Sequence, residues 1–232
     1  MFNSKYSKTL TVILIIVIIL IVGLLIFFGI DVYRKYYIET AAGEAVGEFQ
    51  NKVNQIVTKP PEENVILNDI TPNVDLNTIY QNTTSNSNDS ESGTGVTYMG
   101  FDVIGTIEIP AIDIEYPIIP EYQNGIKALN VGIVVLYPAG SKINQVGNTV
   151  FAGHNYRNGT FFSNNKKLKN GDKVYITDTS GEKVTYEIYH KYETSTSDSE
   201  YMNRDTNGKR EISLSTCTDD TTRRLIIWAK EV

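Results

Sequence analysis

A cysteine, a histidine and an arginine stand at the ends of three separate apolar segments of this 232-residue chain. Cys217, the one cysteine, closes the alternating segment 212–216, His154 ends the run Phe-Ala-Gly-His, and Arg224 opens the apolar run 225–229. A thiolate is a strong nucleophile, an imidazole exchanges protons near neutral pH, and a guanidinium donates hydrogen bonds to an oxyanion. These three residue types at strand ends suit nucleophilic catalysis through a covalent intermediate.

The side-chain alternation around the cysteine places its thiol on a polar face. Ile212 and Leu214 would face a core, whereas Ser213, Ser215 and Cys217 would face the other way. A cysteine used only for packing would more naturally lie with the aliphatic residues. From the alternation alone, a reactive thiol and a small inert strand residue both stay open.

Two further side chains compete for the histidine and arginine positions. His190 shares a predicted strand face with the apolar residues of 184–188, which indicates packing rather than catalysis. Arg223 and Arg224 point to opposite faces of one strand, so only one of them can face a groove beside Cys217. The residue pattern leaves that choice open.

Two motifs carry a resemblance to a known family. Residues 214–217, Leu-Ser-Thr-Cys, followed by Arg224, resemble the Thr-Leu-x-Thr-Cys…Arg motif of the sortases, and Gly-His at 153–154 resembles the sortase Gly-His motif. The resemblance runs from about Gly105 to the C-terminus, in the family's order, behind an N-terminal membrane anchor. It implies a cysteine transpeptidase on an eight-stranded β-barrel, and we expect no metal and no cofactor.

The resemblance also implies roles for individual residues. Cys217 would be the nucleophile that forms an acyl-thioester, His154 the general acid and base, and Arg224 the group that stabilises the oxyanion or the substrate. The family's arginine directly precedes the final apolar strand, which favours Arg224 over Arg223. Four neighbours are expected to bind the substrate: Gly153, Asn155, Thr216 and Asp219.

Class-specific features point in two directions. Gly-His-Asn at 153–155 and Leu-Ser-Thr-Cys at 214–217 resemble class B sortases, whereas the compact segment before residue 212 resembles class D, and both interpretations stay open. That segment carries acidic side chains that match no ligand spacing, so a solvated loop is expected rather than a calcium site. These are Glu193, Asp198, Glu200 and Asp205.

Charge and cysteine content exclude several classes of protein. The formal net charge is −6, and no basic stripe marks a nucleic-acid surface, so no nucleic-acid partner is expected. Residues 1–100 hold 6 basic and 10 acidic side chains, and residues 101–232 hold 15 and 17, so the C-terminal part is nearly neutral. One cysteine permits no intramolecular disulfide, and an unpaired thiol in an outward-facing protein is a candidate reactive group.

The N-terminal segment predicts a membrane anchor. Residues 10–30 are uncharged and apolar, and at about 1.5 Å per helical residue they span a hydrocarbon core of ~30 Å. A cleaved signal peptide has a shorter apolar core and a small-residue cleavage site, so a retained transmembrane helix is favoured. Two basic residues lie on each side, which leaves the orientation open. The resemblance implies a cytoplasmic N-terminus at 1–9 and an extracellular catalytic domain, as a single-pass protein of the cell membrane.

Residues 31–97 are predicted to connect the anchor to the catalytic domain. Apolar residues recur at helical spacing up to about Lys59, and Pro-Pro at 60–61 ends the pattern, which predicts a stalk helix without a specific partner. Residues 62–97 are rich in Asn, Ser, Thr and Asp, which is typical of a disordered linker. We interpret this linker as a flexible tether that gives the domain reach.

Residues 98–232 are predicted to form the catalytic domain as an all-β fold. Short strands separated by turn signals predict a closed barrel or a sandwich, and the count agrees with the eight-stranded sortase-type β-barrel with short helices. Phe161 and Phe162 should anchor a short helix or loop at 161–169. The predicted strands are 103–109, 114–118, 132–136, 149–152, 173–178, 183–190, 212–216 and 224–230.

The resemblance to sortases, with which the residue chemistry and the apolar N-terminal segment agree, implies a membrane-anchored thiol transpeptidase of the hydrolase class, working on a Gram-positive cell wall. It would cleave an LPxTG-like or NPxTx-like sorting motif at the C-terminus of secreted surface proteins and transfer the acyl group to an amine. The acceptor would be a peptidoglycan precursor or a pilin. Two alternatives remain, namely a cysteine peptidase without an amine acceptor and a non-catalytic tethered binding module.

Overall fold

The computed structural model describes residues 4–58, 94–120, 125–138 and 142–232 of the chain. It divides into two compact units, residues 1–41 and residues 42–232. The predicted tether falls mainly on residues 59–93, which lie outside the described residues.

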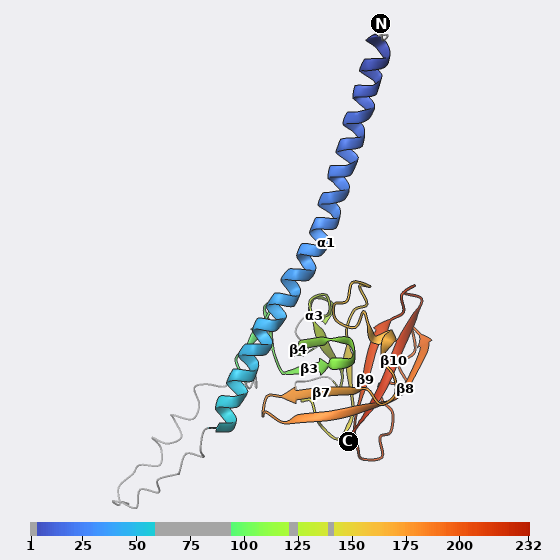
Figure 1. Ribbon diagram of the computed structural model, residues 1–232. Helices are drawn as coiled ribbons and strands as arrows, with labels where there is room; N and C mark the ends of the chain where they lie inside the picture. The colour runs from blue at the N-terminus through green and yellow to red at the C-terminus, as the bar shows by residue number, and fades with distance from the viewer. Residues whose placement is uncertain (1–3, 59–93, 121–124, 139–141) are drawn as a thin grey trace, which may run out of the picture. The chain divides into compact units, whose positions relative to one another are not determined.

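Helix α1 (Ser4–Thr58) begins in the first unit and continues into the second unit (Figure 1). The apolar side chains of 10–30 are exposed, and α1 is the one helix of the described residues that is long and apolar enough to cross a membrane. The predicted stalk belongs to this same helix, which ends just before Pro60.

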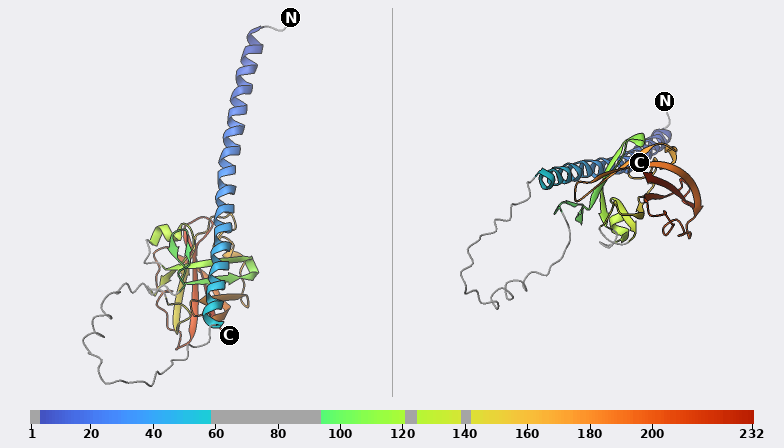
Figure 2. Two further views of the ribbon diagram at one scale, coloured as in Figure 1. Left: turned by 90° about the vertical axis from the view of Figure 1, so that its left-hand side faces the viewer. Right: turned by 90° about the horizontal axis from the view of Figure 1, so that it is seen from below.

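The second unit contains a closed eight-stranded barrel, as predicted. Its order is β10-β8-β7-β3-β4-β5-β6-β9, closed by pairing of β9 with β10. One half of its wall is therefore green to yellow and the other orange to red (Figure 2). The strands are β3 (Gly105–Ile109), β4 (Ile114–Pro120), β5 (Ile133–Tyr137), β6 (Gly147–Ala152), β7 (Lys173–Asp178), β8 (Lys183–Ser195), β9 (Arg210–Cys217) and β10 (Arg223–Glu231).

Short elements surround the barrel. All eight predicted strands are confirmed, and β8 runs five residues further than expected, to Ser195. Phe161 and Phe162 are fully buried beside a short 3-10 turn, which confirms their predicted anchoring role. The short elements are β1 (Thr97–Tyr98), β2 (Phe101–Asp102), η1 (Pro110–Ile112), α3 (Gly125–Leu129) and η2 (Asn165–Lys167).

Strand β9 is buried on both faces over most of its length. Ile212 and Leu214 face the interior as predicted, but Ser213 and Ser215 are also buried. The reason is that the β8–β9 connection folds over the outer face, where the Tyr201 hydroxyl lies 3.3 Å from Ser215 Oγ. Cys217, the last residue of β9, lies where this cover ends and is half-buried.

The C-terminal part of α1 is integral to the second unit. Its apolar positions are almost fully buried, so the expectation of a stalk without a specific partner is wrong over this part. Helical spacing predicts such an apolar stripe, but it does not say what covers the stripe. The buried residues are Ala42, Ala45, Val46, Phe49 and Val53.

Two contacts identify the barrel elements against which this part of α1 packs. Gln50 Nε2 donates a hydrogen bond of 2.9 Å to Glu115 Oε1 on β4. Gly181, at the β7–β8 turn, has a φ of +88°, and a Cβ there would lie 2.8 Å from methyl groups of both Val53 and Val57. A side chain at position 181 would therefore be strained twice, by its backbone conformation and by the helix.

We predict that Phe49→Ala lowers the free energy of unfolding of residues 42–232 by about 3 kcal/mol, because it opens a cavity between α1 and the barrel. Ile56→Ala is the matched control on the same helix, since Ile56 is 50% exposed and should cost less than about 1 kcal/mol. Denaturant unfolding followed by circular dichroism measures both. Equal, small effects would mean that α1 is not part of the folded domain.

Candidate active site

Strand β9 brings the three candidate catalytic residues together through its two neighbours. It pairs in parallel with β6, from Gly147 opposite Arg210 to Ala152 opposite Ser215. His154 and Cys217 each follow the last ladder pair by two residues, so the pairing brings them to the same end of the two strands. On the other side β9 pairs antiparallel with β10, where Arg224 is the direct partner of Cys217.

The backbone around Gly153 continues the contact beyond the last ladder pair. Gly153 N donates to Ser215 O at 3.2 Å, and Thr216 Oγ1 donates to Gly153 O at 2.7 Å. A Cβ on Gly153 would lie 2.9 Å from the ring of Phe162, so glycine is required for packing here. Gly153 and Thr216, both expected to contact substrate, thus hold the histidine segment against β9.

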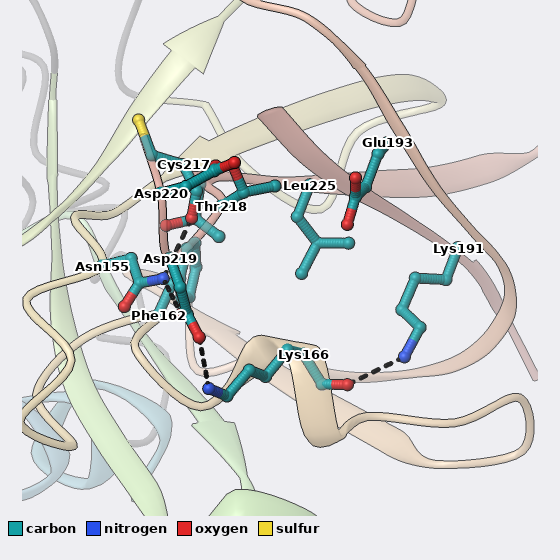
Figure 3. A pocket seen from close by; sticks show the side chains of 11 residues that line it. Asn155, Phe162, Lys166, Lys191, Glu193, Cys217, Thr218, Asp219, Asp220 and Leu225 are labelled. Atoms are coloured by element: carbon teal, nitrogen blue, oxygen red, sulfur yellow. Dashed lines mark hydrogen bonds and ion pairs between the residues drawn. The ribbon is translucent and has the colours of Figure 1, made fainter. Parts of the chain in front are cut away.

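The thiol of Cys217 points away from a pocket at the end of β9. A pocket of about 440 Å³ lies beneath the end of β9, with Phe162, Thr216 and Leu225 among its lining residues. Cys217 contributes to its wall, but Figure 3 shows the sulfur pointing away from Asp219. Because Cys217 and Arg224 are direct partners in the ladder, their side chains leave the sheet on the same, outer face.

The outer face next to Cys217 carries an apolar cluster. Val150 and Ile226 are fully buried there beneath Tyr201, and Trp228 packs against them. His190 lies on this side too, exposed, with its ring centroid 4.9 Å from that of Trp228. A β-bulge between Trp228 and Ala229 shifts the β8 register, which removes His190 from the interior face predicted for it.

His154 is oriented by a residue that the sequence did not single out. Its Nε2 lies 3.1 Å from Oδ1 of Asn130, which follows α3, and its ring centroid is 5.0 Å from that of Tyr156. An amide oxygen only accepts, so Nε2 carries the proton and Nδ1 remains for proton exchange. Burial lowers the pKa of His154 from its ordinary value of 6.5.

Arg224 is the arginine on the thiol side of β10. It is half-buried, and its Nε donates to Thr196 O at 3.2 Å, which fixes the guanidinium plane. Within the described chain, no partner is recorded for its two terminal nitrogens, so they can donate to a developing oxyanion. Arg223 is exposed and binds Glu193 O at 2.9 Å instead.

Asn155 and Asp219, also expected to bind substrate, contact each other. Asn155 Nδ2 donates to Asp219 Oδ1 at 2.9 Å and to Cys217 O at 3.0 Å. Lys166 Nζ forms an ion pair with Asp219 Oδ2 at 2.5 Å (Figure 3). The hydrogen bonds from Lys166 and then Asn155 hold the pKa of Asp219 below its ordinary value.

Sequence reasoning missed Asn130 and Lys166. Asn130 comes before β5 and β6 in the sequence, whereas Cys217 comes after them, and no motif marks Asn130. Lys166 is one of three lysines in the segment 166–169, and only the fold distinguishes the one that reaches Asp219. Neither residue carries a sequence signal stronger than its residue type.

Comparison with known proteins matches the barrel to one family. The family model described as Sortase domain matches residues 107–232. Sortase A of Bacillus anthracis is 34% identical over 131 residues, which cover 54% of this chain and 58% of the relative. The chain therefore spans less than two thirds of the length of that curated relative.

Solved structures of similar proteins are also sortases. Sortase A from Corynebacterium diphtheriae, a lid mutant, is 30% identical, with a TM-score of 0.50 over 57% of this chain and 71% of the other. The pilus-related sortase C of Group B Streptococcus is 27% identical, with a TM-score of 0.50 over 56% and 67%. A Clostridium perfringens sortase D5 transpeptidase, 23% identical, shares the fold with a TM-score of 0.55 over 83% and 99%.

We predict that His154 titrates below 6.5 in the folded protein, because burial disfavours the imidazolium. The unfolded chain then binds more protons than the folded chain below pH 6.5, so stability falls as the pH drops from 6.5 toward the folded pKa. The Hε1 signal in an NMR titration measures the midpoint, with His154→Gln as the assignment control. His154→Gln should also lose this part of the acid sensitivity, and a midpoint at or above 6.5 would contradict the prediction.

Proposed function

The chain belongs to the sortase family, since the Sortase domain model covers residues 107–232 of 232, and from this premise we propose that it is a membrane-anchored cysteine transpeptidase. The observation that carries the proposal is the register of three strands, which brings His154, Cys217 and Arg224 to one end of the barrel wall. A thiol, a base and an oxyanion donor are the groups that acyl transfer requires.

The first half-reaction forms the thioester. Neutral His154 takes the proton of the Cys217 thiol, and Sγ attacks the carbonyl carbon of the threonine in a C-terminal sorting motif. The terminal nitrogens of Arg224 donate to the oxyanion of the tetrahedral intermediate. The C–N bond then breaks, the imidazolium of His154 gives its proton to the departing amine, and the acyl group stays on sulfur.

The second half-reaction transfers the acyl group. An amine of a peptidoglycan precursor or of a pilin attacks the thioester, neutral His154 takes its proton, and the C–S bond breaks to release the cysteine. The low pKa of His154 favours the neutral form that this step needs. Water attacks the same thioester more slowly, so hydrolysis is the side reaction. The partner proteins are secreted proteins that bear a sorting signal.

We predict an acyl adduct on Cys217 when residues 42–232 are incubated with pooled LPxTG-like and NPxTx-like peptides. Intact mass spectrometry detects the adduct, and Cys217→Ala should form none. Added amine should convert the product from the acid to the amide. If the acid forms at an unchanged rate with every amine, the protein is a peptidase. If no adduct forms and Cys217 also resists alkylation, the binding-module alternative gains.

The paired arginines supply a matched control for the same assay. Arg224→Ala should lower kcat/KM for acylation about 100-fold or more, because it removes donors to the oxyanion. Arg223→Ala, one residue away on the opposite face, should stay within about threefold of wild type.

We further propose that the chain crosses the membrane once, with residues 1–9 inside and the barrel outside. Its single cysteine provides the test, because a membrane-impermeant maleimide should label Cys217 in intact cells. Cys217→Ala should remain unlabelled. If Cys217 is labelled only after cell lysis, the barrel lies inside the cell and the proposed orientation is wrong.

A further inference from the structure

Side chains replace the backbone ladder where β6 and β9 separate. After the pair of Ala152 and Ser215, the next contact between the two segments beyond Gly153 is made by an amide: Asn155 Nδ2 donates to Cys217 O at 3.0 Å. Three residues, Asn155, Asp219 and Lys166, form one connected set, which we call the polar clamp (Figure 3).

The amide of Asn155 is held in one orientation. Both of its donor directions are used, one by Cys217 O and one by Asp219 Oδ1, while its own Oδ1 accepts from Arg157 N at 3.1 Å. The second oxygen of Asp219 accepts from Lys166. Reversing the amide would place its oxygen against a carbonyl and a carboxylate, so the contacts specify the donating orientation.

The polar clamp acts on the position of His154. On one side of the histidine, Gly153 is bonded to Ser215 and Thr216, and on the other side Asn155 is bonded to Cys217. The histidine is thus fixed between two residues that are each attached to β9. Without the hydrogen bond from Asn155 to Cys217, His154 would be held to β9 only through Gly153.

The solvent exposure of Lys166 and Asp219 indicates that their ion pair positions His154 rather than stabilises the fold. The side chains of Lys166 and Asp219 are 55% and 45% exposed, and ion pairs this exposed add little to stability. Through Asn155, these two side chains are connected to the carbonyl of Cys217, and a small displacement of Cys217 or His154 would have a large effect on the rate of acyl transfer.

We propose that Asn155 is a positioning residue for acyl transfer, and that Asp219 and Lys166 keep its amide directed at the Cys217 carbonyl. This rests on the proposed function, in which proton exchange between His154 and the reacting groups depends on their spacing. The clamp is expected to change the rate of the chemical step and to leave peptide binding nearly unchanged.

The test compares variants of the full chain in detergent with a matched control. The variants are Asn155→Ala, Lys166→Met, Lys166→Arg and the double variant of Asn155→Ala with Lys166→Met. Lys167→Met is the control, because Lys167 is exposed on the same 3-10 turn and has no side-chain partner within the described residues. Three quantities are measured: kcat and KM for peptide acylation, the rate of Cys217 alkylation by iodoacetamide at pH 7.5, and the thermal midpoint.

We expect Asn155→Ala to lower kcat about 30- to 100-fold with KM within about twofold, since a displacement near 1 Å costs about that much. Lys166→Met should lower kcat about fivefold, Lys166→Arg should restore it, and Lys167→Met should match wild type. Because Lys166 acts through Asn155, the double variant should be no slower than Asn155→Ala alone. Thermal midpoints should stay within a few degrees.

Three outcomes would overturn the proposal: an unchanged kcat in Asn155→Ala, independent effects that multiply in the double variant, or changes confined to KM. The last would make Asn155 and Lys166 substrate-binding residues. The alkylation rate separates this proposal from the proposed function. If wild type acylates no peptide but Asn155→Ala still slows alkylation about tenfold or more, the clamp stands and the transpeptidase assignment fails. If neither reaction responds to Asn155→Ala, the clamp fails.

Discussion

The parallel pairing of β6 with β9 is the constraint on which this site depends. It fixes which residue of one strand stands beside which residue of the other, although they are separated by 63 positions in the chain. A slip by one residue would turn either His154 or Cys217 to the opposite face of the sheet. The interior side chains of both strands, such as Phe151 and Leu214, oppose such a slip because they are fully buried.

The two spacings within the site are set by different means. Cys217 and Arg224 belong to an antiparallel hairpin, whose short turn is closed by Thr218 N donating to Arg223 O at 3.0 Å. The Asp220 carboxylate accepts hydrogen bonds from Thr218 and Thr222 inside that turn, which lowers its pKa to about 2. Parallel strands cannot be joined by such a turn, so the spacing of His154 and Cys217 has no local support.

Much of this architecture follows from the sequence, and the exceptions have physical causes. Strands alternate apolar and polar residues whatever they pair with, so the eight strands were predictable, as was the side of β9 that bears Cys217. Alternation does not reveal what covers a face, so the burial of Ser213 and Ser215 and the packing of Phe49 on the barrel were not predictable. The bulge that moves His190 outward changes the alternation itself, and it depends on tertiary context.

The contacts that sequence reasoning missed lie where local support for the site is absent. Asn130 and Lys166, and the bond from Asn155 to Cys217 O, lie on the histidine side. On the arginine side, the hairpin turn and the bond from Arg224 to Thr196 O hold the geometry. The β6–β9 ladder ends before His154 and Cys217, so beyond it side chains must hold these two residues at their spacing. Asn155 directly follows the Gly-His motif, but Asn130 and Lys166 come from loops that the fold brings near, so their positions follow no fixed spacing from the motif. This explains why Cys217 and His154 are recognisable in the sequence, whereas Asn130 and Lys166 are not.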